Sequence, residues 1–227
     1  MKSLGNGSGF SNVYTSACFL ADNDLVLIDI GDTAYHRLQK MDLTKYENIF
    51  LFITHTHFDH IGGLAIFVQH VFYNLGKKLT IVAPSKAVKK DIKTLLKIGD
   101  ISKDMYSLKN AEKFSSSFFI KVVPTVHSSG YLADKCFGYV FSENGTQIVY
   151  TGDTSTIEPF RNYITEGSSL YVDISVHYGK VHLKLEDVIE ELKSYAAKGI
   201  KVYLMHLDDK AAAKEAIKDI KNMYIFK

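Results

Sequence analysis

The sequence of 227 residues has few cysteines, no long hydrophobic run and almost no net charge, and each absence excludes a class of protein. Cys18 and Cys136 are too few and too far apart for a disulfide framework, so we expect both to be buried thiols in a reducing cytoplasm. No apolar run approaches the ~20 residues of a membrane span. No basic-then-apolar segment opens the chain, so neither membrane insertion nor secretion is expected.

The balance of charge also argues against a dedicated polyanion-binding protein. The formal net charge is +2, and the lysines are spread along the chain. One mild cluster lies on an expected helix and comprises Lys86, Lys89, Lys90, Lys93 and Lys97. We favour a solvated helix face here over a nucleic-acid footprint.

Length and composition fit one globular unit. Apolar residues make up 46% and charged residues 23%, as in ordinary soluble domains. The length suffices for a substantial core. We see neither an internal repeat nor an interdomain linker, so we predict a single domain over residues 1–227.

The most informative stretch is Thr54-His55-Thr56-His57-Phe58-Asp59-His60. It follows the apolar segment 49–53, which is rich in β-branched and aromatic residues and reads as a buried strand. Three imidazoles and a carboxylate within six residues form a nitrogen and oxygen ligand set suited to zinc, iron or manganese. The alternative is a polar loop with chance histidines. We favour a metal site.

Other polar residues follow expected strands in the same way. His127 comes after the segment 118–123, Asp153 after 147–150, and His206 after 201–205. Asp29 is polar within an apolar strand, 25–30, and should therefore have a buried partner. We expect helices at 64–75, 84–97, 185–197 and 211–222, and we find little pattern between residues 98 and 117.

The pattern His-x-His-x-Asp-His resembles the signature of the metallo-β-lactamase superfamily. The resemblance implies an α/β fold, a four-layer αβ/βα sandwich with the site along one edge. It implies two divalent metal ions, zinc first, with manganese or iron as alternatives. The first ion would be held by His55, His57 and His127, the second by Asp59, His60 and His206, with Asp153 bridging both. Asp29 would support the metal loop from behind.

Two cations roughly 3.5–4 Å apart lower the pKa of a shared water and yield hydroxide at neutral pH. They also stabilise the charge that develops on the substrate. Asp59 is placed to orient the hydroxide and accept its proton, beside its role as a ligand.

Two further segments, Tyr150–Thr154 and Val181–Lys184, look like those of the ribonuclease Z-like phosphodiesterases. In that subgroup a histidine at the position of His182 contacts the scissile phosphate and helps the leaving oxygen. The alternative for His182 is a helix-capping or exposed residue. His177 is a weaker candidate, and His36 and His70 read as ordinary surface or helix residues.

Ribonuclease Z carries a long arm between the third histidine and the bridging aspartate. Here only 25 residues separate His127 from Asp153, and a loop and a hairpin occupy them. A structured RNA substrate is therefore not expected. Compact members of this kind act on cyclic nucleotides, and include phage enzymes that destroy cyclic-nucleotide immune signals.

The sequence thus predicts a cytoplasmic metal-dependent phosphodiesterase for small substrates, 3′,5′-cyclic nucleotides first, with Ser128, Ser129 and Tyr131 lining the base pocket. The resemblance also implies a homodimer. Ribonuclease Z-like RNA processing, a lactonase or glyoxalase-type hydrolase, and a catalytically silent metal-binding protein are the alternatives.

Overall fold

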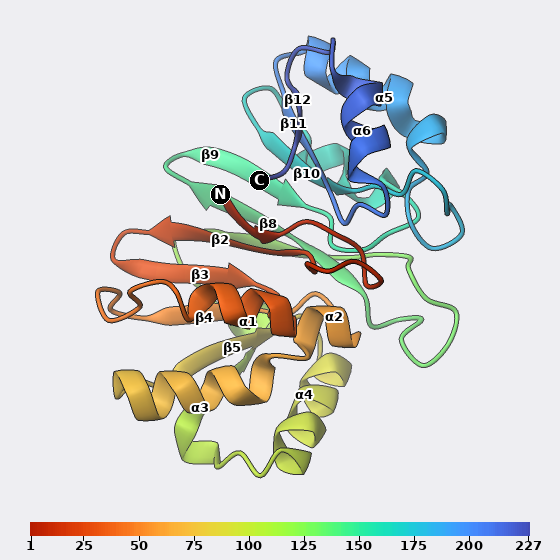
Figure 1. Cartoon of the computed structure of the whole chain (residues 1–227). Helices are drawn as coiled ribbons and strands as arrows, with labels where there is room; N and C mark the ends of the chain where they lie inside the picture. Colours follow the sequence, from red (N-terminus) through yellow and green to blue (C-terminus); the bar gives the residue numbers. More distant parts are fainter. The chain divides into compact units, whose positions relative to one another are not determined.

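The computed structural model describes residues 1–227 and has a mixed α/β architecture with two six-stranded sheets (Figure 1). The chain divides into two compact units. Unit 1 comprises residues 1–5 and 12–116, and unit 2 comprises residues 6–11 and 117–227. The single domain over 1–227 stays a prediction.

Unit 1 contains the first sheet, whose strands follow one another in chain order. The first three strands pair antiparallel and the remaining pairs are parallel. The strands are β1 (Lys2–Gly5), β2 (Ser16–Ala21), β3 (Asp24–Ile28), β4 (Ile49–Phe52), β5 (Leu79–Ala83) and β6 (Tyr106–Asn110). The helices are α1 (Asp32–Leu38), α2 (Phe58–Ile61), α3 (Leu64–Leu75) and α4 (Lys86–Ile98), with 3-10 turns η1 (Lys103–Met105) and η2 (Ala111–Lys113).

The helices of unit 1 pack because of their residue spacing. Helix α4 buries Val88, Ile92 and Leu96, which recur every four residues on one face. Ser85 begins this helix by accepting a hydrogen bond from the Val88 N–H at 3.2 Å. Figure 1 shows α1, α3 and α4 over one face of the first sheet.

Unit 2 contains the second sheet, again in chain order along the sheet. Its strands are β7 (Phe119–Pro124), β8 (Phe137–Glu143), β9 (Thr146–Tyr150), β10 (Ser169–Asp173), β11 (Lys201–Met205) and β12 (Met223–Ile225). Strands β7 to β9 pair antiparallel and β9 to β12 pair parallel. The 3-10 helix η3 (Glu158–Tyr163) and the helices α5 (Leu185–Ala197) and α6 (Lys210–Ile217) complete the unit.

The core of unit 2 joins its sheet to these helices. Leu170, Val202 and Leu204 from the strands are fully buried with Leu192 of α5 and Ala213 of α6. No helix in either unit combines the length and hydrophobicity needed to cross a membrane. Both cysteines are buried free thiols, as predicted.

The two units share one topology that the sequence does not reveal as a repeat. In each, a three-stranded antiparallel meander leads into three further parallel strands. Parallel strands end at the same edge of a sheet, so the loops after them meet there. This edge carries the predicted site residues of each unit.

The structure corrects one predicted element and adds a strand that was not predicted. The helix predicted over 211–222 ends at Ile217, and Met223–Ile225 forms β12 instead. Residues 98–117, which show little pattern, contain the edge strand β6. Both strands are short and lie at sheet edges, where pairing with a neighbour decides the structure and local periodicity is weak.

Candidate metal centre

Unit 1 presents four possible ligands at the carboxyl edge of its sheet. His55 lies just beyond the end of β4, and His57 is the N-cap of the short helix α2, which carries Asp59 and His60. We call these four residues the unit-1 donor group. The sequence predicted all four, because they fall within six residues.

The unit-1 donor group is compact. The Nε2 atom of His55 lies 2.9 Å from Nδ1 of His57. The Nε2 atom of His60 lies 3.3 Å from Oδ2 of Asp59. The ring centroids of His55 and His60 are 4.2 Å apart. Nitrogen and oxygen donors so close together can share a cation.

Asp29 holds this group from below, as the resemblance implied. Its carboxylate accepts hydrogen bonds from the backbone N–H and the hydroxyl of Thr54, at 2.8 and 2.7 Å, and from Nδ1 of His60 at 2.8 Å. Burial raises the pKa of the Asp29 carboxyl, while the His60 charge and these hydrogen bonds oppose the rise. With Nδ1 engaged, His60 presents Nε2 as its ligand atom.

The backbone at Asp29 is strained, which underlines this supporting role. Its φ of 60° lies in the left-handed region, which is uncommon for residues other than glycine. Such a conformation costs on the order of 1–3 kcal/mol and persists only when the surroundings fix it. The three hydrogen bonds to Asp29 do so.

Unit 2 presents three predicted ligands at the carboxyl edge of its own sheet. His127 follows β7, Asp153 follows β9, and His206 follows β11. The Oδ2 atom of Asp153 lies 3.6 Å from Nε2 of His127 and 3.2 Å from Nε2 of His206. We call these three residues the unit-2 donor group. One carboxylate oxygen between two imidazole nitrogens suits a bridging ligand.

Hydrogen bonds fix the orientation of this second group. Nδ1 of His127 donates to the backbone carbonyl of Val181 at 2.9 Å. A carbonyl only accepts, so Nδ1 carries the proton and Nε2 presents its lone pair as the ligand atom. The hydroxyl of Thr125 donates to the backbone carbonyl of Asp153 at 2.9 Å and fixes the loop after β9.

His182 stands beside the unit-2 donor group. Its ring centroid lies 4.8 Å from that of His127 and 4.7 Å from that of His206, the latter pair being stacked. Burial lowers the pKa of His182, but the charge and hydrogen bond of Asp173 outweigh it, so the pKa is raised. The structure therefore gives His182 a specific buried partner, which a mere helix cap would not need.

That partner, Asp173, is a residue that sequence reasoning missed. It ends β10, is fully buried, and accepts hydrogen bonds from Nδ1 of His182 and the N–H of Thr154, both at 2.8 Å. Its other oxygen lies 3.4 Å from Nδ1 of His206. The sequence did contain a signal for Asp173, because a carboxylate at the end of an apolar strand needs a buried partner. The same signal identified Asp29.

A pocket of about 550 Å³ opens beside this group within unit 2. It is lined by Ser8, Phe10 and Ser11 from residues 6–11, by Ser175, His177, Tyr178, Val181 and His182, and by His206 and Asp208. Asp208 accepts hydrogen bonds from the Ser175 hydroxyl and the N–H groups of Val176 and His177. Burial raises the pKa of this carboxyl, but the hydrogen bonds outweigh it and lower the pKa.

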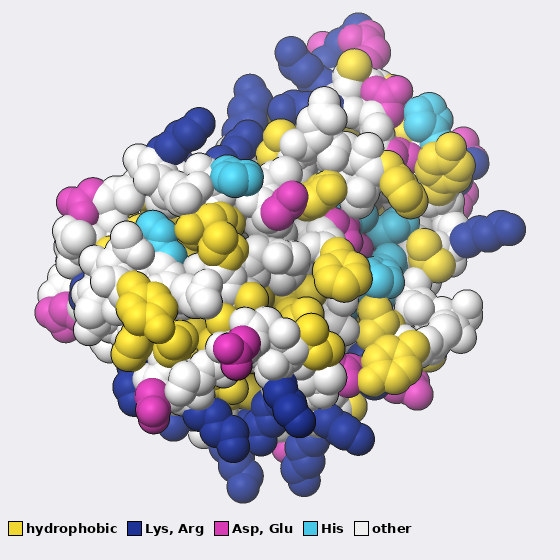
Figure 2. Space-filling model, turned by 60° about the horizontal axis from the view of Figure 1, so that its bottom comes forward, with side chains coloured by type: hydrophobic (Ala, Val, Ile, Leu, Met, Phe, Trp, Pro, Cys, Tyr) yellow, Lys and Arg dark blue, Asp and Glu magenta, His cyan; other side chains and the backbone are white.

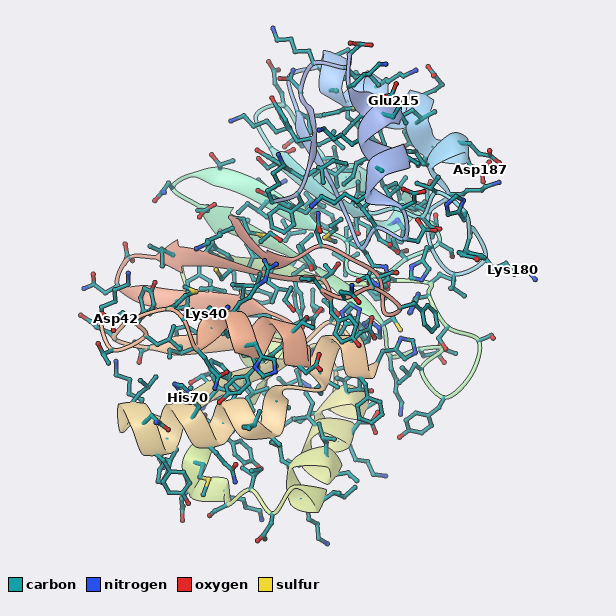
Figure 3. All side chains as sticks on the ribbon, viewed as in Figure 1. Lys40, Asp42, His70, Lys180, Asp187 and Glu215 are labelled. Carbon is teal, nitrogen blue, oxygen red and sulfur yellow. The ribbon has the colours of Figure 1, made fainter.

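The remaining candidates are placed elsewhere. Ser128, Ser129 and Tyr131 lie in the loop between β7 and β8, outside the residues that line this pocket, and Lys135 sits over the Tyr131 ring at 3.3 Å. Their role at the base stays a prediction. His70, labelled in Figure 3, lies on α3 with Nδ1 3.3 Å from the Tyr35 hydroxyl, and His36 contacts Gln39 on the surface. Both fit the ordinary roles expected.

The donor chemistry in each unit fits a divalent transition metal. Imidazole and carboxylate ligands suit zinc, iron and manganese. In unit 2, the sets His127, Asp153, His182 and Asp173, His182, His206 each bring their ligand atoms within 4.8 Å of one another. Each unit also supplies the supporting hydrogen bonds that metal-binding histidines normally have.

The family model for the anti-Pycsar protein Apyc1 matches residues 1–226. The chain belongs to the Apyc1 family. Its relatives include anti-Pycsar protein Apyc1 of Bacillus phage BSP38, 27% identical over 92% of this chain and 89% of that protein. Apyc1 of Bacillus phage 010DV004 is 25% identical over 91% and 88%. Ribonuclease Z of Leuconostoc mesenteroides is 37% identical, but over 44% of this chain and 34% of its own length.

Solved structures agree on the fold of this Apyc1-family chain. YhfI of Bacillus subtilis, a metallo-β-lactamase fold protein, matches with a TM-score of 0.76 at 16% identity, over 99% of this chain and 93% of that one. A diphosphatase of the PhnP family matches with a TM-score of 0.72 at 19% identity, over the same shares. The predicted metallo-β-lactamase fold is confirmed. The chain is a metal-dependent hydrolase, as the sequence predicted.

Proposed function

We propose that this chain hydrolyses 3′,5′-cyclic nucleotides to linear nucleoside monophosphates. The observation that carries the proposal is the pocket of about 550 Å³ in unit 2. Small-molecule pockets span roughly 300–1,000 Å³. This one suits a single nucleotide and not the body of a folded RNA.

The lining of the pocket matches the parts of a nucleotide. His182 and His206 line it, and a phosphate there would meet the unit-2 donor group. Phe10 and Tyr178 offer exposed aromatic rings, and a base stacked on such a ring gains about 1–3 kcal/mol. Ser8 and Ser11 supply hydroxyls for the sugar. Phe10 and Tyr178 belong to segments far apart in the sequence, so sequence reasoning did not pair them.

The ligand assignment predicted from the sequence stands as part of this proposal. Two divalent cations, zinc first, are assigned to seven residues: His55, His57, Asp59, His60, His127, Asp153 and His206. The geometry within each donor group supports it separately, through the close nitrogen and oxygen atoms described above. The resident metal is set by availability as well as by ligand type.

When bound, two such cations supply Lewis acidity and a water of lowered pKa. The protein's own residues then handle the protons. Asp59, partly exposed at the edge of unit 1, orients the attacking water and accepts its proton on a carboxylate oxygen. His182, as the doubly protonated imidazolium, gives its Nε2 proton to the leaving 3′ oxygen as the O–P bond breaks, and keeps the Nδ1 proton that Asp173 holds.

Ribonuclease Z-like RNA processing is the second candidate, since curated ribonucleases Z match part of the chain. The interval between His127 and Asp153 argues against it. A loop, β8, a hairpin turn and β9 occupy it, so it holds no arm for transfer RNA. We therefore propose little processing of precursor transfer RNA.

The homodimer also remains a proposal. It rests on the resemblance, and sedimentation of the purified chain at several concentrations tests it. A sedimentation coefficient that stays at the monomer value up to high concentration contradicts it.

A substrate panel tests the function. Purified protein is assayed with zinc, manganese or iron against cyclic AMP, GMP, CMP and UMP, a precursor transfer RNA, a lactone and a thioester. We expect linear monophosphates from at least one cyclic nucleotide, and about two transition-metal ions per chain by elemental analysis. Efficient cutting of the RNA with every cyclic nucleotide untouched reverses the proposal.

A further inference from the structure

Positive charge is concentrated in one part of unit 1. Residues 86–113 contain eight lysines and four acidic residues, a formal charge of +4, whereas the whole chain carries +2. The rest of the chain is therefore slightly acidic. We call these eight lysines the lysine face: Lys86, Lys89, Lys90, Lys93, Lys97, Lys103, Lys109 and Lys113.

The fold brings these lysines onto one surface. Lys89, Lys93 and Lys97 are four residues apart on α4 and so share one side of the helix. Lys109 comes from β6 and Lys113 from η2. Partial burial and then the charges of Lys93, Lys109 and Lys113 lower the pKa of Lys89, as expected where these cations face one another. Figure 2 shows Lys and Arg side chains gathered along the lower edge of its view.

A groove of about 730 Å³ runs beside this surface. Lys93, Lys97 and Lys103 line it together with Tyr106, Leu108, Ile101, Ser102 and a single acidic residue, Asp100. The lysines are exposed, while the Tyr106 ring is half-buried. The groove thus has lysine side chains along its walls and an aromatic ring that a ligand in the groove can reach.

The lysine face begins at the edge of the sheet that carries the unit-1 donor group. Parallel strands β4, β5 and β6 end at this edge, α4 starts there after β5, and Lys109 lies one residue before the end of β6. The other end of α4, with Lys97, lies toward the opposite edge. A helix of 13 residues is about 20 Å long, so the lysine face is an extended track.

We propose that the lysine face binds single-stranded nucleic acid, with phosphates on the lysines and a base on Tyr106. A cationic groove combined with an aromatic platform is how single strands are held without sequence preference. The extended track fits several successive phosphates better than one small anion. Its concavity disfavours a flat lipid surface. The proposal concerns binding and is independent of cyclic-nucleotide hydrolysis.

Binding is measured on the full chain by fluorescence anisotropy with a labelled 12-residue thymidine oligonucleotide, without added divalent metal. We expect dissociation constants on the order of 10 μM at 50 mM salt and a steep loss of affinity with added salt. The variant Lys93→Glu/Lys97→Glu/Lys103→Glu should bind at least tenfold more weakly. The slope of log affinity against log salt concentration should become shallower by about two units. Each lost phosphate contact to a single strand removes about 0.7 from this slope, and the variant loses three.

A matched control reverses the same number of exposed lysines in unit 2, Lys198→Glu/Lys201→Glu/Lys221→Glu, and should bind like the unaltered chain. Tyr106→Leu should lower affinity about fivefold or more and leave the salt dependence unchanged. Hydrolysis of cyclic nucleotides should be the same in all of these proteins, which separates this proposal from the function proposed above.

Several results overturn the proposal. One is the absence of any anisotropy change up to about 200 μM protein at 50 mM salt. Another is equal weakening by the lysine-face variant and its unit-2 control. Competition by inorganic phosphate or a mononucleotide as effective as the unlabelled oligonucleotide would indicate a small-anion site. Binding to phosphatidylserine vesicles in place of the oligonucleotide would indicate a membrane surface.

Discussion

Replacing Asp173 by asparagine tests whether this buried carboxylate positions His182. Asparagine has nearly the same shape, and its carbonyl oxygen can still accept from the Thr154 N–H. What the variant loses is the negative charge opposite Nδ1 of His182, at 2.8 Å. A hydrogen bond to a charged group is worth about 1.5–3 kcal/mol.

That range corresponds to a roughly ten- to hundredfold fall in kcat/KM, since each 1.36 kcal/mol is tenfold. We expect the loss in kcat, because His182 would act on the leaving oxygen and not on substrate affinity. Initial rates on the best cyclic nucleotide, at saturating metal, measure it. Elemental analysis on the same samples shows whether metal is retained.

Asp209→Asn is the matched control. Asp209 is the N-cap of α6, where its carboxylate accepts from the Ala212 N–H at 2.9 Å, and asparagine caps a helix equally well. We expect its activity within about twofold of the unaltered chain. If Asp173→Asn were equally active, or if its loss followed metal content alone, the positioning role would be refuted.

Three further changes probe the site and the fold. Asp153→Ala should abolish activity and reduce metal content, since this carboxylate lies between two ligand histidines. The control His36→Ala should change neither, and similar behaviour of the two variants would refute the ligand role of Asp153. His182→Ala should keep its metal and lose on the order of a hundredfold in turnover, and lost metal in a folded protein would make it a ligand instead. The hydrogen bond from Arg161 lowers the pKa of Glu191 and outweighs burial, which raises it. The ionised carboxylate therefore stabilises the fold above its ordinary pKa of about 4.3, and this stabilisation is lost as the pH falls through the lowered pKa. Glu191→Gln should therefore cost up to about 1 kcal/mol of unfolding free energy at pH 7, for a partly exposed pair, and progressively less as the pH falls through the lowered pKa; a cost that does not change with pH would contradict this linkage.

The sequence by itself determined the metal-binding motif and the fold family. His55, His57, Asp59 and His60 fall within six residues and follow an apolar strand, so local pattern alone predicts a ligand cluster at a strand end. Asp29 was recognisable for a related reason, because a carboxylate inside an apolar strand needs a partner. The long helices α3 and α5 were predicted to the residue, since their apolar spacing is regular.

Tertiary structure decided the rest, because it depends on which strands lie side by side. Asp173 becomes a partner of His182 and His206 only when the ends of β10 and β11 meet at one edge. Phe10 and Tyr178 share a pocket because the segment of residues 6–11 pairs with the chain after β11 through Gly7 and Leu207. The edge strand β12 has only three residues, and β6 buries only one of its five, so neither shows a clear strand pattern in the sequence. The lysines that looked dispersed along the chain form one face because α4, β6 and η2 bring them together, and linear spacing does not encode that proximity.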